Sequence, residues 1–211
     1  MPRGGAGRIK GSQGERARAR KELRAALLAA ARELAEESQG FEAVTIRKVA
    51  DRVGYAAPVV YEYFANKRDL LHAVVTNGFA DLADRLDAAE PTVEAAAAVV
   101  WDFAVEEPYR YHLMHSLADV PFGTSGTPAS AVRCFELLKA AVTAAAPDHF
   151  ASTVDDDAAT DLFWAQAHGL ITLAFNGRVK GGRERARALL DCVATALRTP
   201  SQADSLSRGH E

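Results

Sequence analysis

Apolar residues recur along this chain with the spacing of an α-helix. Between residues 46 and 53 they stand at i, i+3, i+4 and i+7, which places them on one helical face. Similar stretches follow along the chain, separated by Gly, Pro and helix-capping residues. None of them alternates apolar and polar residues as a β-strand does, and the sequence contains no internal repeat. The pattern predicts nine helices: a short one that carries Val60 and Phe64, and others near residues 15–38, 46–53, 67–89, 92–107, 108–117, 127–145, 155–176 and 183–197.

The composition favours an all-α fold. Of the 211 residues, 48% are hydrophobic, with many alanines and few β-branched runs, and alanine has the highest helix propensity. A chain of this length forms one or two small domains with a hydrophobic core. No apolar run approaches the ~20 residues that span a bilayer, and the N-terminus lacks the apolar segment of a secretory signal. We therefore expect a cytoplasmic protein that does not bind membranes.

Residues 45–64 have the pattern of two short helices joined by a tight turn. Thr45 is the predicted N-cap of the first helix, because its side chain can accept a hydrogen bond from a free helical N–H. Gly54 ends that helix, since the residue after a helix end often needs a positive φ. Ala50, Gly54 and Val60 together fit a helix-turn-helix, whose second helix can enter a DNA major groove.

Several short motifs surround this pattern: Gly40-Phe41, Thr45-Ile46, Val49-Ala50, Val53-Gly54, Tyr61 with Tyr63 and Phe64, Asn66-Lys67 and Leu70-Leu71. Together they resemble the DNA-binding domain of the tetracycline-repressor (TetR)-like family of bacterial transcription regulators, over residues 23–71. The chain departs from the family at Ala56-Ala57-Pro58, where Ser followed by Lys or Pro with Gly is common. Pro58 suits a first helical turn, but Ala56 cannot cap the helix with its side chain.

The resemblance implies an all-α, nine-helix, two-domain TetR-like fold. In that fold residues 15–71 form a helix-turn-helix DNA-binding domain, and residues 72–199 form a ligand-binding and dimerisation domain. We expect a disordered basic arm at residues 1–14 and a loose tail at residues 200–211. The resemblance therefore predicts double-stranded DNA, a small-molecule effector and a second copy of the chain as partners.

The distribution of charge agrees with a DNA-binding N-terminal domain. Residues 1–70 contain 14 Lys or Arg and 9 Asp or Glu, a net charge of +5, whereas the remaining residues contain 11 and 19, a net charge of −8. A positive domain attracts the phosphate backbone, and an acidic one repels it. The basic arm and the start of the first helix either form a solvated tail or follow the DNA backbone into a minor groove.

Ten residues are predicted to contact DNA: Thr45, Arg47, Lys48, Ala56, Ala57, Pro58, Val59, Tyr61, Tyr63 and Lys67. Helix N-termini bind phosphate, so Thr45 can do more than cap, while Arg47 and Lys48 are either DNA contacts or solvated charges. The resemblance implies phosphate contacts for both tyrosines and for Lys67, and the alternative for the tyrosines is a packed ring with a solvated hydroxyl. The second helix has no Arg, Asn or Gln for bidentate purine contacts, so base readout there relies on thymine methyl groups.

Bulky aromatic and polar side chains in the second half of the chain are typical of a ligand pocket. The candidates are Trp101, Tyr111, His112, His115, Phe135, Trp164 and His168. Trp164, His168 and Gly169 resemble a Trp-His-Gly signature of one TetR-like C-terminal subgroup, a likeness that covers most of residues 100–197. Trp164 and His168 lie one helical turn apart on the same face, and a place in the core or in a dimer interface is the alternative for each candidate.

The last two predicted helices are too apolar to be buried on one side only. Their candidate interface residues are Leu162, Leu170, Leu173, Leu189, Leu190, Val193 and Leu197. The resemblance implies that such a pair forms a four-helix dimer interface. A two-fold homodimer presents two reading helices about 34–36 Å apart, which predicts a palindromic operator.

No pattern in the sequence indicates an enzyme, a cofactor or a metal site. The chain has no P-loop, dinucleotide fingerprint or nucleophile elbow. Cys134 and Cys192 lack metal spacing and are expected to be buried free thiols. The sequence thus favours a ligand-responsive repressor; the alternatives are a TetR-like activator, a regulator without a small ligand, and a helical protein-interaction module.

Overall fold

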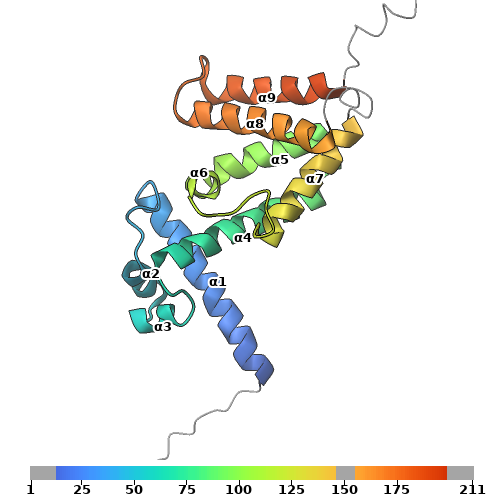
Figure 1. Ribbon diagram of the computed structural model, residues 1–211. Coiled ribbons are helices and arrows are strands. Elements are labelled where there is room, and N and C mark those ends of the chain that lie inside the picture. The colour runs from blue at the N-terminus through green and yellow to red at the C-terminus, as the bar shows by residue number, and fades with distance from the viewer. Residues whose placement is uncertain (1–12, 146–154, 199–211) are drawn as a thin grey trace, which may run out of the picture. The chain divides into compact units, whose positions relative to one another are not determined.

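The computed structural model describes residues 13–145 and 155–198, and every regular element in those ranges is an α-helix. In chain order they are α1 (Gln13–Glu37), α2 (Ile46–Val53), α3 (Ala57–Tyr61), α4 (Lys67–Ala88), α5 (Val93–Glu106), α6 (Pro108–Ser116), α7 (Ala129–Ala145), α8 (Asp156–Phe175) and α9 (Gly182–Arg198) (Figure 1). The predicted all-α fold is confirmed. The predicted arm up to residue 12 and the predicted tail from residue 200 lie outside the described residues.

The chain divides into two compact units, the first ending at Val74 and the second beginning at Val75. The first unit contains α1, α2, α3 and the first turns of α4. The second contains the remainder of α4 and the helices α5 to α9. α4 is one uninterrupted helix, so it belongs to both units.

The ends of α2 are fixed by the residues that the sequence identified. The backbone N–H of Lys48 donates a hydrogen bond to the side-chain oxygen of Thr45, 3.2 Å away, which makes Thr45 the N-cap. Gly54 has φ 75°, and its N–H donates to the carbonyl of Asp51. A side chain at position 54 would be strained at this φ although the space around it is open. Local sequence therefore sets both the length of α2 and the turn that leads to α3.

The core of the first unit is formed by the predicted apolar face of α2 together with side chains of α1, α3 and α4. Its fully buried members are Leu27, Ala31, Val44, Val49, Ala50, Val60 and Leu70. Burial of one Val or Leu side chain stabilises a fold by about 1.5–3 kcal/mol. This cluster, rather than helix propensity, therefore holds the five residues of α3 in helical form.

The start of α4 is capped by two side chains. The N–H of Asp69 donates to the side-chain oxygen of Asn66 at 2.9 Å, as predicted for an N-cap. The carboxylate of Asp69 accepts in return from the N–H of Ala65 at 3.0 Å, one residue earlier than in a regular capping box. Both bonds fix where α4 begins relative to the end of α3.

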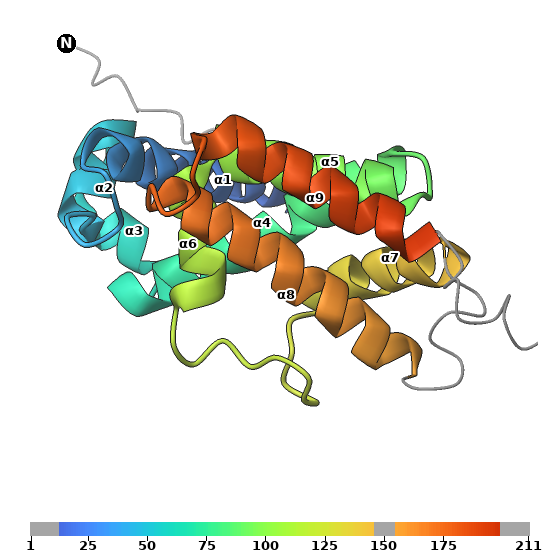
Figure 2. The same cartoon turned by 90° about the horizontal axis from the view of Figure 1, so that it is seen from above.

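The second unit is a helical bundle in which α8 and α9 lie side by side and antiparallel (Figures 1 and 2). α7 packs on α8, and α5 packs on α9. Thr92 and Asp155 cap α5 and α8 by accepting from the N–H groups of Ala95 and Ala158. The helix predicted near residues 127–145 begins two residues later, at Ala129, and the side chain of Thr127 accepts from the N–H of Thr124, at 3.1 Å, and does not cap it.

A buried cation connects α4 and α6. The side chain of Arg110, on α6, is only 2% exposed and donates to Asp81 of α4 at 2.7 Å and to Glu107 at 3.0 Å. It also donates to the amide oxygen of Asn77, at 2.9 Å. A buried guanidinium is stable only when its donors meet acceptors of this kind. Charge pairing therefore adds to apolar packing where these two helices meet.

Two features are absent from the described ranges, residues 13–145 and 155–198. None of the helices there is long and apolar enough to cross a lipid bilayer. Nor do those residues bring three or more His, Cys, Asp or Glu side chains together as a metal site would need.

Candidate functional site

The second helix of the helix-turn-helix turns one face outward. Val60 and Phe64 are buried, with 0% and 2% of their surfaces exposed. Pro58 is exposed and Tyr61 is 54% exposed. Ala57 and Val59 are half-buried, and Ala56 precedes α3 without a side-chain cap, as its sequence predicts. The outward face of α3 is therefore small and mostly apolar around one tyrosine hydroxyl.

Three basic residues flank this helix. Arg47 and Lys48 are exposed on α2, and Lys67 is half-buried in the first turn of α4. The ammonium of Lys48 donates to the carbonyl of Ala43, at 2.9 Å, and that of Lys67 donates to the carbonyl of Glu42, at 2.7 Å. Each ammonium has three donors, so both lysines can hold the loop before α2 and still contact an anion.

Arg20 adds to this surface in a way the sequence analysis missed. The sequence places it among the basic residues at the start of the first helix, and it lies on α1 with its guanidinium 4.9 Å from the ring centroid of Tyr63. It also donates to the carbonyl of Glu62, at 3.2 Å. A contact between residues 42 positions apart leaves no local sequence signal. Tyr63 is half-buried beneath Arg20, which leaves Tyr61 as the more accessible of the two tyrosines.

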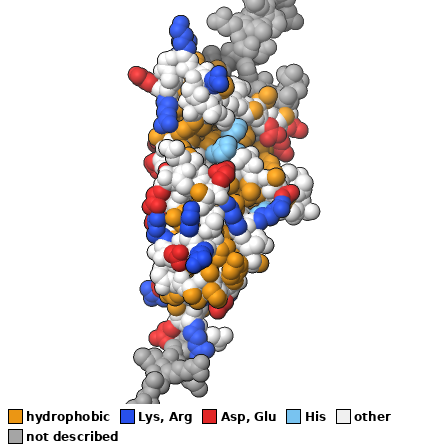
Figure 3. Space-filling view, turned by 90° about the vertical axis from the view of Figure 1, so that its left-hand side faces the viewer, with side chains coloured by type: hydrophobic (Ala, Val, Ile, Leu, Met, Phe, Trp, Pro, Cys, Tyr) orange, Lys and Arg blue, Asp and Glu red, His pale blue; other side chains and the backbone are white. Residues whose placement is uncertain are grey.

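Positive charge does not gather into one patch on the face shown in Figure 3, where Lys and Arg side chains are scattered among acidic and hydrophobic ones. Three of the 14 basic residues of positions 1–70 are Arg3, Arg8 and Lys10, which lie outside the described residues.

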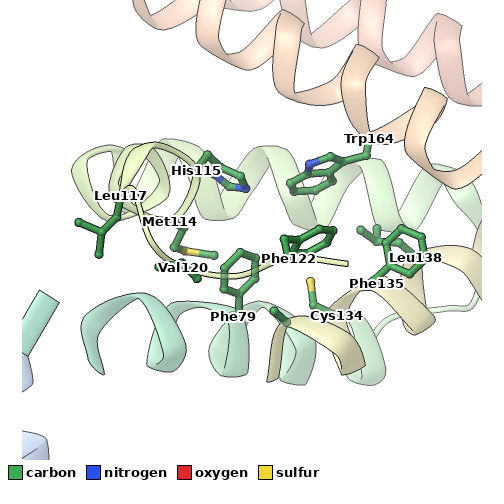
Figure 4. A pocket seen from close by; sticks show the side chains of 11 residues that line it. Phe79, Met114, His115, Leu117, Val120, Phe122, Cys134, Phe135, Leu138 and Trp164 are labelled. Carbon is green, nitrogen blue, oxygen red and sulfur yellow. The ribbon is translucent and has the colours of Figure 1, made fainter. Parts of the chain in front are cut away.

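A cavity of about 210 Å³ lies in the second unit between α4, α6, α7 and α8 and the loop that joins α6 to α7 (Figure 4). Its lining residues are Phe79, Met114, His115, Leu117, Val120, Phe122, Ala131, Cys134, Phe135, Leu138 and Trp164. In the close view His115 and Trp164 lie on one side of the cavity, and Phe79 and Cys134 lie on the other. The wall is almost entirely apolar.

Only part of the predicted ligand-binding set lines this cavity. His115, Phe135 and Trp164 do so. Trp101 is buried elsewhere on α5 and His112 is exposed on α6, so the prediction that they share this cavity is wrong. Apolar positions such as Phe79 were missed, because a cavity-lining and a core-packing side chain look alike in a sequence.

Tyr111 and His168 form a second layer behind the cavity wall. The hydroxyl of Tyr111 and Nδ1 of His168 are 3.1 Å apart, within hydrogen-bond distance. The His168 ring is stacked on Trp164, with 6.4 Å between ring centroids, and lies 4.7 Å from the ring of His115. These two residues therefore orient the aromatic side chains that line the cavity instead of lining it themselves.

Burial keeps this region uncharged at neutral pH. The pKa of His115 is lowered to about 4: burial is the largest cause, the hydrogen bond to the carbonyl of Tyr111 opposes it, and the nearby His168 adds to the lowering. Burial also lowers the pKa of His168 and raises the pKa of the Tyr111 hydroxyl. It raises the pKa of the Cys134 thiol to about 12. The cavity thus presents neutral groups to anything that binds in it.

The depressed pKa of His115 predicts acid sensitivity. Between its ordinary pKa of 6.5 and about 4, the unfolded chain binds more protons than the folded one. The free energy of unfolding is therefore complete above pH 6.5 and falls as the pH drops toward 4, by on the order of 3 kcal/mol. Urea titrations across this window should show a much smaller fall for His115→Phe. Equal falls in that variant and in the exposed control His112→Phe would contradict this assignment.

A second apolar surface lies on α8 and α9. Leu162, Leu173 and Leu189 are 48%, 48% and 37% exposed, unusually high for leucine. The groove between the two helices is lined by Ala165, Gln166, Gly169, Leu170, Leu173, Leu189, Cys192, Val193, Ala196 and Leu197. An added side chain at Gly169 would meet open space.

Two predictions about these helices are wrong. Leu190 is fully buried inside the unit, so it cannot contribute to an exposed surface. Cys192 is exposed and lines the groove, whereas Cys134 is buried as expected. Adjacent positions of a helix point about 100° apart, which is why Leu189 faces outward and Leu190 faces the core.

A capped helix, a glycine turn and a short second helix with an outward face define a helix-turn-helix DNA-binding protein. Residues 27–74 match the family described as bacterial regulatory proteins, tetR family. Residues 93–197 match the family described as tetracyclin repressor-like, C-terminal domain. The chain belongs to the TetR family of bacterial regulatory proteins and is a DNA-binding transcriptional regulator.

Solved structures of similar fold agree. A protein with unknown function from Rhodococcus sp. RHA1 is 25% identical, with a TM-score of 0.63 over 89% of this chain and 94% of its own. A TetR transcriptional regulator from the same organism is 24% identical, with a TM-score of 0.54 over 88% and 97%. A TetR family transcription regulator from Marinobacter aquaeolei VT8 is 17% identical, with a TM-score of 0.56 over 85% and 97%. No curated protein sequence matches the chain.

Proposed function

We propose that the protein is a repressor that binds a palindromic operator as a homodimer and releases it when a small molecule occupies the α4–α8 cavity. The observation that carries this proposal is the course of α4. Its first residue, Lys67, contacts the loop before α2, and further along the same helix Phe79 lines the cavity. One continuous helix thus carries residues of both the helix-turn-helix unit and the effector cavity.

Contacts around the cavity support a route for the signal. A ligand there touches α6 through Met114 and His115 and touches α4 through Phe79. Arg110 joins α6 to α4 by its bonds to Asp81 and Asn77, so a shift of α6 pulls on α4. If the ligand lowers operator affinity, the operator must lower ligand affinity by the same factor.

The apolar groove of α8 and α9 supports dimerisation. Exposed leucines gathered on two adjacent helices form an apolar patch of the kind that marks a protein–protein contact. A second copy of the same two helices supplies a self-complementary surface across a two-fold axis. The dimer then places two copies of α3 about 34–36 Å apart on one side of the duplex.

Selection of bound DNA fragments with the purified protein, followed by footprinting, tests the proposal. The expected site is an inverted repeat, protected over two successive major grooves on one face. Protection of a single half-site by a monomer would overturn the dimeric mode. Operator affinity that stays the same with a ligand seated in the cavity would overturn the switch and leave DNA binding intact.

Removing the proposed contacts of Tyr61 and Lys67 with the DNA phosphate backbone should weaken binding to all DNA sequences equally. In the double variant Tyr61→Phe with Lys67→Gln, the glutamine can still donate to the carbonyl of Glu42, so the fold is kept. One fewer cation at the DNA backbone reduces the slope of log affinity against log salt by about 0.9. Fluorescence anisotropy at several salt concentrations measures this slope. Lys180→Ala, an exposed lysine of the second unit, is the control, and an equal slope in both variants would remove Lys67 from the interface.

A further inference from the structure

The hydrogen bond of His115 determines which of its ring nitrogens carries the proton. Nδ1 lies 2.7 Å from the backbone carbonyl oxygen of Tyr111. A carbonyl oxygen only accepts, so Nδ1 must carry the hydrogen. Because burial holds the ring neutral at pH 7, Nε2 has a free lone pair and acts as an acceptor.

That acceptor has no partner within the described part of the chain. Nε2 of His115 is fully buried and makes no hydrogen bond there. Aromatic rings surround it, with the centroids of Trp164 and Phe79 at 5.2 and 6.0 Å from that of the imidazole. A buried polar atom without a partner costs about 1–3 kcal/mol. Such an atom beside a cavity is a ready site for a ligand donor.

The remaining lining residues restrict what else the ligand can carry. Apart from His115, the side chains of the lining are hydrocarbon rings and chains, one indole, one thioether and one neutral thiol. No lysine, arginine or carboxylate is among them. An ionised group placed there would lose its hydration without gaining a counter-charge. The cavity therefore selects against charged ligands.

Volume limits the size of the ligand. The cavity measures about 210 Å³, whereas a cavity of ~150 Å³ is known to hold benzene and drug-sized pockets begin at ~300 Å³. One substituted ring, or an aliphatic group of similar size, fits these limits.

We propose that this cavity binds a small neutral molecule with a single ring, or of equal bulk, whose hydroxyl or N–H group donates a hydrogen bond to Nε2 of His115. The inference rests on the proposed function, which assigns the cavity to the effector. Nε2 is fully buried, so a neighbouring side chain has to move before the donor reaches it, and the half-buried Trp164, with its ring centroid 5.2 Å from that of the imidazole, is placed to do so. Phe122, on the loop between α6 and α7, lines the cavity and is 54% exposed, so this part of the lining borders solvent.

Three para-substituted ethylbenzenes, which differ by at most two non-hydrogen atoms, test the donor requirement. 4-Ethylphenol carries the hydroxyl, 4-ethylanisole replaces it by a methyl ether, and 4-ethylbenzoate carries an ionised carboxylate. Calorimetric titration of the full-length protein at neutral pH should give the phenol about tenfold higher affinity than the ether, as expected for one hydrogen bond to a buried acceptor. The benzoate should bind at least about 100-fold more weakly than the phenol, because its charge has no counter-ion.

Two matched variants test whether the preference for the phenol over the ether comes from His115. His115→Phe keeps a ring of similar size but removes the acceptor, so the phenol should lose its advantage while the ether binds as before. His112→Phe makes the same exchange on the exposed side of α6 and should leave all three affinities unchanged. A phenol preference that survives in His115→Phe, or equal binding of phenol and ether to the unaltered protein, would overturn the proposal.

Two further outcomes separate this proposal from the function on which it rests. Binding of none of the probes at about 1 mM, with operator binding intact, overturns the ligand class alone. Selective binding of the phenol without any change in operator affinity supports the ligand class and instead overturns the effector-responsive function. Fluorescence anisotropy, with the phenol at a saturating concentration, measures whether operator affinity changes.

Discussion

Leu173→Arg is expected to convert the proposed dimer into a monomer and to reduce operator affinity by about 10²–10⁴-fold, since both half-sites must be held together for full avidity. Leu173 is 48% exposed on α8 and lines the groove shared with α9. An arginine there is solvated in the monomer but would be buried against its own copy in the dimer. Light scattering coupled to size-exclusion chromatography measures the mass, and fluorescence anisotropy measures operator affinity.

Val132→Arg is the matched control for this prediction. Val132 is 46% exposed on α7 and does not line the groove, so the same change in chemistry should leave mass and operator affinity unaltered. Equal denaturation curves for the monomeric variant and the control at high dilution would show that the unit still folds. A Leu173→Arg protein that remains dimeric would place the interface on another surface.

Arg110→Met should lower the free energy of unfolding by about 2–3 kcal/mol, because the buried hydrogen bonds are lost while the carboxylates left behind, on Asp81 and Glu107, are 38% and 24% exposed and stay partly hydrated. Methionine keeps much of the length of the side chain but supplies no donor to Asp81, Glu107 or Asn77. The loss should appear as a lower urea midpoint with an unchanged slope.

Arg85→Met provides the comparison, because Arg85 has similar partners in an exposed setting. Its guanidinium forms an ion pair with Glu106 at 2.7 Å. Both guanidinium groups also lie near the ring of Phe103: that of Arg85 is 5.2 Å from the ring centroid, and that of Arg110 is 5.6 Å from it. Arg85 is 38% exposed whereas Arg110 is 2% exposed, so its ion pair contributes about 0–1 kcal/mol. Similar losses for the two variants would show that burial does not strengthen the Arg110 contacts.

The helix-turn-helix was predictable because its determinants are local. Thr45 caps α2 through a bond spanning three residues, and Gly54 ends it through its own φ. The inward positions Val49, Ala50 and Val60 follow from helical periodicity alone. The exception on this unit is Arg20, whose contacts with Glu62 and Tyr63 come from a distant part of the chain.

The cavity was only partly predictable, because lining it depends on the rotation of each helix about its axis. His112 and His115 are three residues apart on α6, yet one is exposed and the other lines the cavity. Leu189 and Leu190 are adjacent on α9, yet one is exposed and the other is fully buried. A helix that is apolar on several sides gives no sequence signal for the side that meets a neighbour.

The sequence by itself predicted that the described residues are all α-helical, that Thr45 and Gly54 bound α2, and that a helix-turn-helix follows from them, since each of these depends on bonds and spacings within about four residues. Only the tertiary structure decided which aromatic residues share a cavity, that Arg110 connects α4 to α6, and that Nε2 of His115 has no partner within the described residues. These properties arise between side chains that are distant in the sequence. They exist only once the hydrophobic effect has fixed how the helices pack.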